Sequence, residues 1–196
     1  MLITDSALTS GRITPMNNDP VLTLIFYFLL PLWMAAGFAD WWCHLKARIE
    51  HNAGVQESLI HLLMFAQMGA GLLACLFLEL NALVFAILIG LFATHEATAL
   101  WDISFASARR RISPIEQQVH SFLELLPLLG IALLAVKYWP ALQTISDQDA
   151  NWVLRLKSDP VPLRHVIAVL GAATVFAVMP FAEEVYRTWR ARSRAA

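Results

Sequence analysis

The chain has 196 residues, of which 58% are hydrophobic and 15% are charged. Soluble proteins average about 45–50% apolar and about 25% charged residues, so this composition favours a chain that folds in a membrane. The formal net charge of −1 gives no global electrostatic reason to expect a nucleic-acid partner. Cys43 and Cys75 are the only cysteines, and they imply no disulfide framework.

Residues 1–20 lack the basic segment followed directly by an apolar core that marks a cleavable signal. The first apolar run is therefore expected to remain as a membrane helix. A helix needs about 20 residues to cross about 30 Å of hydrocarbon, and the chain offers five apolar runs of this kind. We predict an all-α integral membrane protein that forms a single membrane domain over residues 1–196. The expected helices cover approximately 21–50, 54–78, 81–106, 114–139 and 163–192, and an exposed loop covers 140–162.

The first two expected helices carry the same pair of residue types at the same membrane boundary. The first helix ends with Asp40-Trp41-Trp42-Cys43-His44, and the second begins after the stop-and-restart sequence Asn52-Ala53-Gly54 with Glu57 and His61. In both helices a carboxylate precedes a histidine by four residues. This spacing places the two side chains on one helical face.

The third and fourth expected helices bring further polar residues to that boundary. The third carries His95 and Glu96, and Asp102 shares a helical face with His95. The sequence Ser113-Pro114-Ile115-Glu116 matches a capping box with proline at the first helical position, and it predicts where the fourth helix begins. Glu116 and His120 then repeat the spacing of four.

Orientation follows from the loop charges, because Lys and Arg that flank short loops tend to stay in the cytoplasm. One side would hold Lys46, Arg48, Arg109, Arg110, Arg111, Arg187, Arg190, Arg192 and Arg194, and the other would hold Arg12, Lys137, Arg155, Lys157 and Arg164. This imbalance predicts a bacterial inner-membrane protein with its N-terminus outside and its C-terminus in the cytoplasm.

This topology predicts a four-helix bundle with a metal site at its cytoplasmic end. The expected ligands are Asp40, His44, Glu57, His61, His95, Glu96, Asp102, Glu116 and His120, and the sequence leaves open whether His95, Glu96 or both bind metal. Supporting roles around the ligands are assigned to His51 and Glu124, whereas His165, Glu183 and Glu184 are interpreted as structural or interfacial. A single such pair is usually a solvated interfacial pair, but three pairs and a fourth cluster at one boundary favour metal binding.

Charge suggests how many ions the site holds. Asp40, Glu57, Glu116 and one of Asp102 or Glu96 would bring four negative charges to the edge of the hydrocarbon, where each uncompensated charge costs at least ~2–3 kcal/mol. Two divalent cations would cancel these charges and still keep an open position for water or oxygen. Mixed carboxylate and imidazole ligands suit iron better than structural zinc, with zinc and manganese as alternatives.

The ligand set is similar in general design to ferritin-like di-iron carboxylate proteins. Their recurring element is Glu-x-x-His, whereas the pairs in this chain are one residue longer. Membrane desaturases and hydroxylases carry clustered HxxxH and HxxHH strings that this sequence lacks. No membership of either family is therefore inferred.

The leading functional hypothesis is a di-iron, oxygen-dependent oxidoreductase, such as a hydroxylase or desaturase. Its expected partners are the lipid bilayer, a lipid or other hydrophobic substrate and an electron donor, with no nucleic acid. The alternatives are a zinc-dependent membrane hydrolase, a metal or proton transporter, and haem binding through His61 and His120. Transport predicts polar residues that continue towards the other face, whereas the outer halves of these helices are almost wholly apolar. The sequence does not assign the substrate or the catalytic residues.

Overall fold

The computed structural model describes residues 19–146 and 150–195 of the chain. Within these ranges the chain is helical and contains no β-strand. Five helices there are long and apolar enough to cross a membrane: Pro20–Ala47, Gly54–Phe77, Ala82–Ser107, Pro114–Lys137 and Leu163–Arg194. The prediction of an all-helical chain with five candidate membrane spans is confirmed.

Two of the five spans are built from more than one helical segment. The first combines α1 (Pro20–Leu24), a π-helical turn (Ile25–Leu29) and α2 (Leu30–Ala47). The next three are the single helices α3 (Gly54–Phe77), α4 (Ala82–Ser107) and α5 (Pro114–Lys137). The last combines α7 (Leu163–Ala173), a π-helical turn (Thr174–Val178) and α8 (Met179–Ala195). The segment expected as an exposed loop, 140–162, includes most of the short helix α6 (Trp139–Gln143) and a 3₁₀ turn (Thr144–Ser146).

Side-chain caps fix where three of the spans begin. The Asp19 carboxylate accepts hydrogen bonds from the backbone N–H groups of Val21 and Leu22, and the Asn81 side chain accepts one from Val84. Ser113 and Glu116 form the reciprocal capping box at the start of α5, so this sequence prediction is confirmed.

The turn between α2 and α3 needs unusual backbone conformations. Arg48 ends α2 with a φ of 50°, and Gly54 begins α3 with a φ of 70°. Glycine adopts positive φ at little cost because it has no Cβ. The glycine at this position therefore lets the chain reverse within a few residues and begin the second candidate span.

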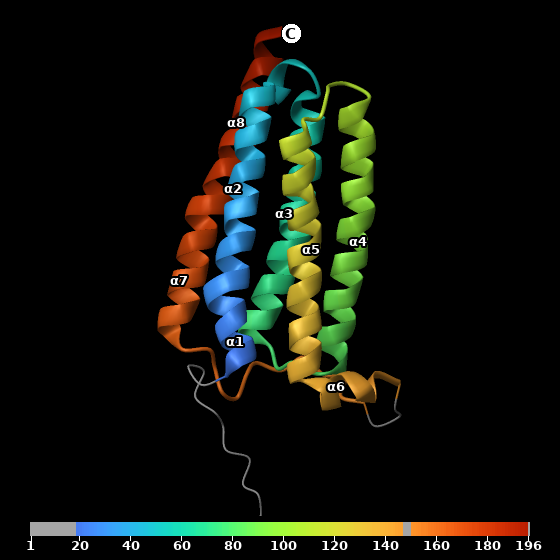
Figure 1. The fold of residues 1–196 in the computed structure, drawn as a ribbon, viewed down its shortest axis with the longest axis vertical. Coiled ribbons are helices and arrows are strands. Elements are labelled where there is room, and N and C mark those ends of the chain that lie inside the picture. Colours follow the sequence, from blue (N-terminus) through green and yellow to red (C-terminus); the bar gives the residue numbers. More distant parts are fainter. Residues whose placement is uncertain (1–18, 147–149, 196) are drawn as a thin grey trace, which may run out of the picture.

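The long helices run side by side along the long axis of the molecule (Figure 1). α3 packs against α4 and α8, and α2 packs against α5. One end of the molecule holds the α2–α3 turn, the α4–α5 turn and the C-terminus of the chain, and we call it the C-terminal end. The α3–α4 turn and α6 lie at the opposite end, here called the α6 end.

The two ends differ in what they bury. The core near the α6 end is apolar and is formed by Ile25, Leu30, Leu76, Leu80, Val84, Phe85, Leu88, Leu134 and Val169. Large apolar side chains are also exposed on outward faces, including Leu100 at 69% and Val136 at 68%. Such faces suit contact with lipid. The charged and imidazole side chains are instead buried in the interior near the C-terminal end.

Candidate metal centre

Carboxylate and imidazole side chains from five helices meet in the interior near the C-terminal end. Eight of them are exposed by 5% or less: Asp40, His44, Glu57, His61, His95, Asp102, Glu116 and Glu184. We call these eight residues together with His120 the polar cluster. The structure thus brings together the three carboxylate–histidine pairs that the sequence predicts on separate helices.

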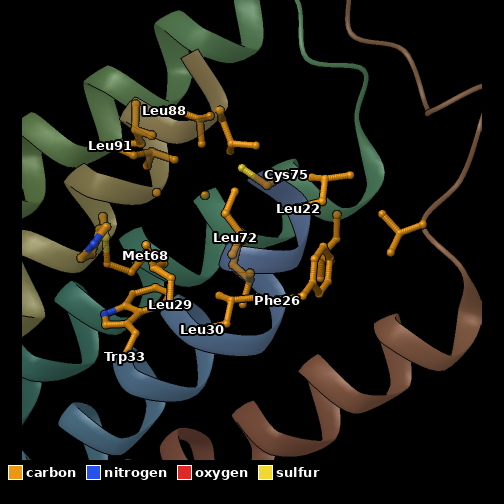
Figure 2. Close-up of a pocket in the computed structure, with 18 of the residues that line it drawn as sticks. Leu22, Phe26, Leu29, Leu30, Trp33, Met68, Leu72, Cys75, Leu88 and Leu91 are labelled. Carbon is orange, nitrogen blue, oxygen red and sulfur yellow. The ribbon is translucent and has the colours of Figure 1, made fainter. Parts of the chain in front are cut away.

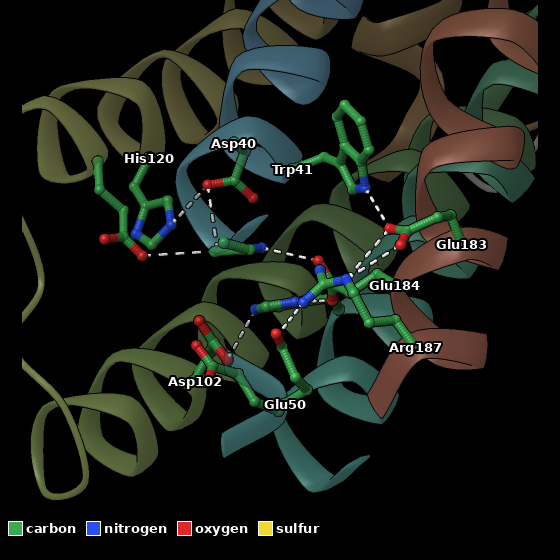
Figure 3. Close-up of polar contacts among 12 residues, drawn as sticks. Asp40, Trp41, Glu50, Asp102, His120, Glu183, Glu184 and Arg187 are labelled. Carbon is green, nitrogen blue, oxygen red and sulfur yellow. Dashed lines mark hydrogen bonds and ion pairs between the residues drawn. The ribbon is translucent and has the colours of Figure 1, made fainter. Parts of the chain in front are cut away.

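The centre of the cluster is a pair of histidines held by one carboxylate. His44 Nδ1 lies 2.9 Å from Glu184 Oε2, and His61 Nδ1 lies 2.8 Å from Glu184 Oε1 (Figure 3). The two rings stack with their centroids 4.3 Å apart. Because a carboxylate only accepts hydrogen bonds, each Nδ1 carries a proton, and each Nε2 is directed away from Glu184 towards other groups.

The free nitrogen of His44 faces other ligand atoms without a hydrogen bond. His44 Nε2 lies 3.5 Å from both Asp40 Oδ1 and Glu116 Oε1, and His120 Nε2 lies 2.9 Å from the same Asp40 oxygen. Asp40 Oδ1 and His44 Nε2 are buried without a hydrogen-bond partner among the described residues. One ligand atom from each of Asp40, His44 and His120 lies within 4.8 Å of the others, as a shared ion would require.

The free nitrogen of His61 has a similar environment. His61 Nε2 lies 3.2 Å from Asp102 Oδ1, and within the part of the chain that the structure describes neither atom has a hydrogen-bond partner. His44, Glu57 and His61 form a second group whose ligand atoms lie within 4.8 Å of one another. Buried polar atoms normally find hydrogen-bond partners, so unsatisfied atoms that face each other mark a place for an additional group.

Arg110, in the turn between α4 and α5, joins two of the carboxylates. Its Nη2 donates to Glu57 Oε1 and to Glu116 Oε1, each at 2.5 Å, and its Nε donates to Glu57 Oε1 at 3.0 Å. Burial alone lowers the pKa of Arg110, but the hydrogen bonds to Glu116 and Glu57 outweigh burial and hold this pKa above its usual value. The guanidinium therefore stays charged and acts as a permanent counter-ion to α3 and α5.

Two members of this arrangement were not expected from the sequence. Glu184 was interpreted as structural or interfacial, and the structure shows that its carboxylate is fully buried between His44 and His61 and therefore does not lie at an interface. Arg110 was counted only as one of three loop arginines. The sequence contained one signal for each residue. Arg110 lies six residues before Glu116, and Glu184 is a charged residue in a candidate membrane span.

These two residues change the charge balance in opposite directions. The buried carboxylates are Asp40, Glu57, Asp102, Glu116 and Glu184. Together with the Arg110 guanidinium they leave four net negative charges when the histidines are neutral. The charge predicted from the sequence was also four, from Asp40, Glu57, Glu116 and one of Asp102 or Glu96, so the requirement for compensating positive charge is unchanged.

The remaining candidate ligands differ in their positions. His95 is buried, neither ring nitrogen has a hydrogen-bond partner among the described residues, and it lines a small cavity with Asp40, His61, Asp102, His120 and Glu124. Glu96 is partly buried and does not line that cavity.

The two histidines that were not expected as ligands lie outside the cluster. The His51 side chain is 68% exposed and lies beside Glu50. His165 lies 3.1 Å from the Tyr27 hydroxyl on the part of the fold near α1 and α7.

A second polar network holds α8 in place next to the cluster. Glu183 accepts a hydrogen bond of 2.9 Å from Trp41 Nε1 and another of 3.0 Å from Arg187 Nε. Arg187 also pairs with Glu50, which follows α2 (Figure 3). These contacts fix the register of α8 against α2 and thereby the position of Glu184.

Two apolar cavities lie among the long helices, and the nearer one reaches the cluster. The nearer cavity, of about 110 Å³, reaches Asp40, His61 and His95 and is otherwise lined largely by apolar side chains. The farther cavity, of about 130 Å³, is lined by residues that include Leu22, Cys75 and Leu88 (Figure 2), and these lie in the parts of α1, α3 and α4 near the α6 end. Both are lined by Trp33, Met68 and Leu72, so they lie on either side of the same three side chains.

No family model, curated protein or solved structure matches this chain. The chemistry of the cluster therefore has to be inferred from its own geometry. Imidazole nitrogens with fixed tautomers, carboxylate oxygens without hydrogen bonds and excess negative charge form a donor set suited to divalent metal ions.

Proposed function

We propose that this chain is a membrane-embedded di-metal oxidoreductase, with iron as the metal, that oxidises a lipid or another hydrophobic molecule with oxygen. The observation that carries the proposal is the meeting of two features. Buried ligand atoms without hydrogen-bond partners lie at the inner end of an apolar cavity. The first feature suits metal binding and the second suits an apolar substrate.

The residues that would hold the ions fall into two groups. Asp40, His44 and His120 would bind one ion, since their ligand atoms already converge. His61 and Asp102 would bind the other, with His95 beside them in the small cavity. Two divalent cations would match the four net negative charges of the region.

Other residues would hold the ligands in position. Glu184 accepts a hydrogen bond from each of His44 and His61, so it fixes both rings with Nε2 directed away from it. Arg110 neutralises part of the charge on Glu57 and Glu116. Such supporting groups typically change metal affinity by roughly 10–100-fold when they are lost.

Bound iron would supply the one-electron and oxygen chemistry that amino-acid side chains lack. The protein would contribute the apolar walls near Met64 and Phe65, which exclude water and admit an apolar molecule to the cluster. An electron donor outside the chain would supply the reducing equivalents. The apolar lining also favours chemistry on a hydrophobic molecule over ion transit, which would require polar groups along the path.

The test of this function is direct. Iron-loaded protein in lipid nanodiscs would be given a chemical reductant, isotopically labelled oxygen and an extract of membrane lipids. The proposal predicts lipid products that incorporate labelled oxygen or lose two hydrogen atoms, together with oxygen consumption. Iron-loaded protein that consumes no oxygen beyond the rate of an Asp40→Asn, His61→Ala control would contradict it.

We also propose that the C-terminal end faces the cytoplasm of a bacterial inner membrane. The α2–α3 turn, the α4–α5 turn and α8 carry the larger set of basic residues, and Arg12 in the smaller set lies outside the described residues. A reporter that fluoresces only in the cytoplasm, fused after Ala196, should be fluorescent. A dark fusion that is instead active with a periplasmic reporter would reverse the orientation.

A further inference from the structure

The two apolar cavities are arranged in series between the polar cluster and the α6 end. Along α3, Cys75 lines the farther cavity and His61 the nearer one. These residues are fourteen positions apart, which corresponds to roughly 21 Å at 1.5 Å per residue. Two small cavities in a row favour a slender, unbranched chain over a fused-ring molecule.

A single basic side chain lines the far end of this path. Lys157 lines the farther cavity, and its ammonium donates one hydrogen bond of 2.7 Å to the Cys75 carbonyl oxygen. A lysine ammonium has three donors, so two remain for other partners. Burial lowers the pKa of Lys157, and a neighbouring anion would favour its charged form.

The position of Lys157 is built into the fold. Its backbone N–H donates to the Phe77 carbonyl at 2.9 Å, and Leu78 pairs with Leu156 in an isolated β-bridge. Asn81, which caps α4, also donates to the Val153 carbonyl at 2.8 Å. The segment before α7 is thus fastened across the α3–α4 turn and holds the lysine over the end of the cavity.

We propose that the two cavities bind one long-chain fatty acid, with its carboxylate at Lys157 and the methyl end of its chain at the polar cluster. This proposal names the substrate class of the proposed oxidoreductase and rests on that function. The charge of Lys157 complements a carboxylate, and the apolar path suits the chain. Oxidation would then fall near the methyl end of the chain, far from the acid group.

Photolabelling can test this without any enzymatic turnover. A long-chain fatty acid with a diazirine near its methyl end would be irradiated with the purified protein in nanodiscs, and labelled peptides would be located by mass spectrometry. We expect the label near Met64 and Leu123, which line the nearer cavity beside the cluster. Label confined to Leu22 and its neighbours would mean the opposite orientation and would overturn the proposal.

Variants separate the two ends of the path. Lys157→Met should weaken labelling by roughly tenfold, the value of one charge-assisted hydrogen bond, whereas Lys157→Arg should retain it. Gly69→Leu should block the nearer cavity, because a Cβ at Gly69 meets no atom within 4 Å and the side chain has room to enter. Gly37→Leu offers the same test from α2 if Gly69→Leu does not insert.

Gly90→Leu is the matched control, since its Cβ also meets no atom within 4 Å and Gly90 lines neither cavity. It should label like the unchanged protein. Equal labelling in Gly69→Leu, Gly37→Leu and Gly90→Leu would overturn the binding path. Metal content measured on the same samples keeps the two proposals apart, because labelling requires no metal and metal binding requires no fatty acid.

Discussion

At the scale of single residues, the cluster depends on which nitrogen of each histidine carries the proton. Glu184 accepts from Nδ1 of both His44 and His61 and thereby leaves both Nε2 atoms as potential ligands. A residue that touches no proposed ion would thus determine how two ligands are presented. Glu183, its neighbour in sequence, contacts Trp41 and Arg187 instead.

Glu184→Gln should therefore weaken metal binding while the protein still inserts. A glutamine side chain has one accepting oxygen and no charge, so it cannot accept from both rings. We expect metal affinity to fall by roughly 10–100-fold in a competition titration with a chelator. Glu79→Gln, in the α3–α4 turn at the α6 end, is the control and should leave the affinity within about twofold of the original, as expected for a position far from the ligands. Equal effects of the two substitutions would remove the positioning role from Glu184.

Arg110 contributes to the stability of the fold, with or without metal, whereas Glu184 contributes to metal affinity. Arg110→Gln would leave Glu57 and Glu116 buried without their counter-ion, and we expect a loss of about 3–5 kcal/mol in unfolding free energy. Thermal unfolding in detergent measures this loss. Arg111→Gln, at an exposed position in the same turn, should have little effect. The Arg110 pKa is raised above a value that is already high, so the titration of Arg110 gives no pH dependence of stability near neutrality.

At the scale of helices, the ends of the spans are tied together by charge as well as by caps. Asp19 caps α1 and also pairs with Lys137 at the end of α5. Burial raises the pKa of Asp19, but the hydrogen bond from Lys137 and those from the backbone of Leu22 and Val21 outweigh it, so the net pKa lies below its ordinary value of 3.8. The ion pair thus joins the first span to the fourth at the α6 end.

This tie should have a defined pH dependence. Because the folded-state pKa of Asp19 is lowered, its stabilisation is present above pH 3.8 and is lost as pH falls through the folded-state value. Asp19→Asn keeps a capping side chain and removes the charge. The unchanged protein should melt at a higher temperature than Asp19→Asn at neutral pH, which corresponds to up to about 1 kcal/mol of unfolding free energy. This difference should shrink in acid. A difference that grows in acid would contradict this expectation and would show that Asp19 stabilises the fold mainly as the cap of α1 and not through its charge.

The helices also show what the sequence could and could not predict. The spans and the start of α5 follow from local patterns, since apolar length and the Ser113 capping box act within neighbouring residues. The repeated spacing identified Asp40 with His44 and Glu116 with His120 for the same reason. The place of α8 was not predictable, because the hydrogen-bond partners of Glu184 lie 123 and 140 residues away in the sequence and not at helical spacing.

At the scale of the whole molecule, polarity is divided along the long axis. The core near the α6 end is apolar, and the buried carboxylates and histidines lie near the C-terminal end. The cavity nearer the cluster is lined largely by apolar side chains apart from Asp40, His61 and His95. This division gathers the buried charges near one end of the molecule, where the net negative charge of the cluster has to be compensated because buried charges are costly without partners.

Two kinds of compensation would balance that charge and can be distinguished. Protonated histidines would leave the cluster as a network of ion pairs, whereas divalent metal ions would use the unpaired Nε2 and carboxylate oxygens as ligands. Haem held by His61 and His120 would instead give optical bands that change on reduction. The three cases differ in what the purified protein contains.

Elemental analysis of the purified protein, in parallel with His61→Ala and His120→Ala, distinguishes them most directly. We expect about two equivalents of a divalent transition metal, mainly iron, in the unchanged protein. Either variant should lose much of this metal while membrane insertion stays intact, because each removes a ligand from one of the two proposed ion positions. No more than trace metal in the unchanged protein, or full occupancy in both variants, would contradict the proposed metal site.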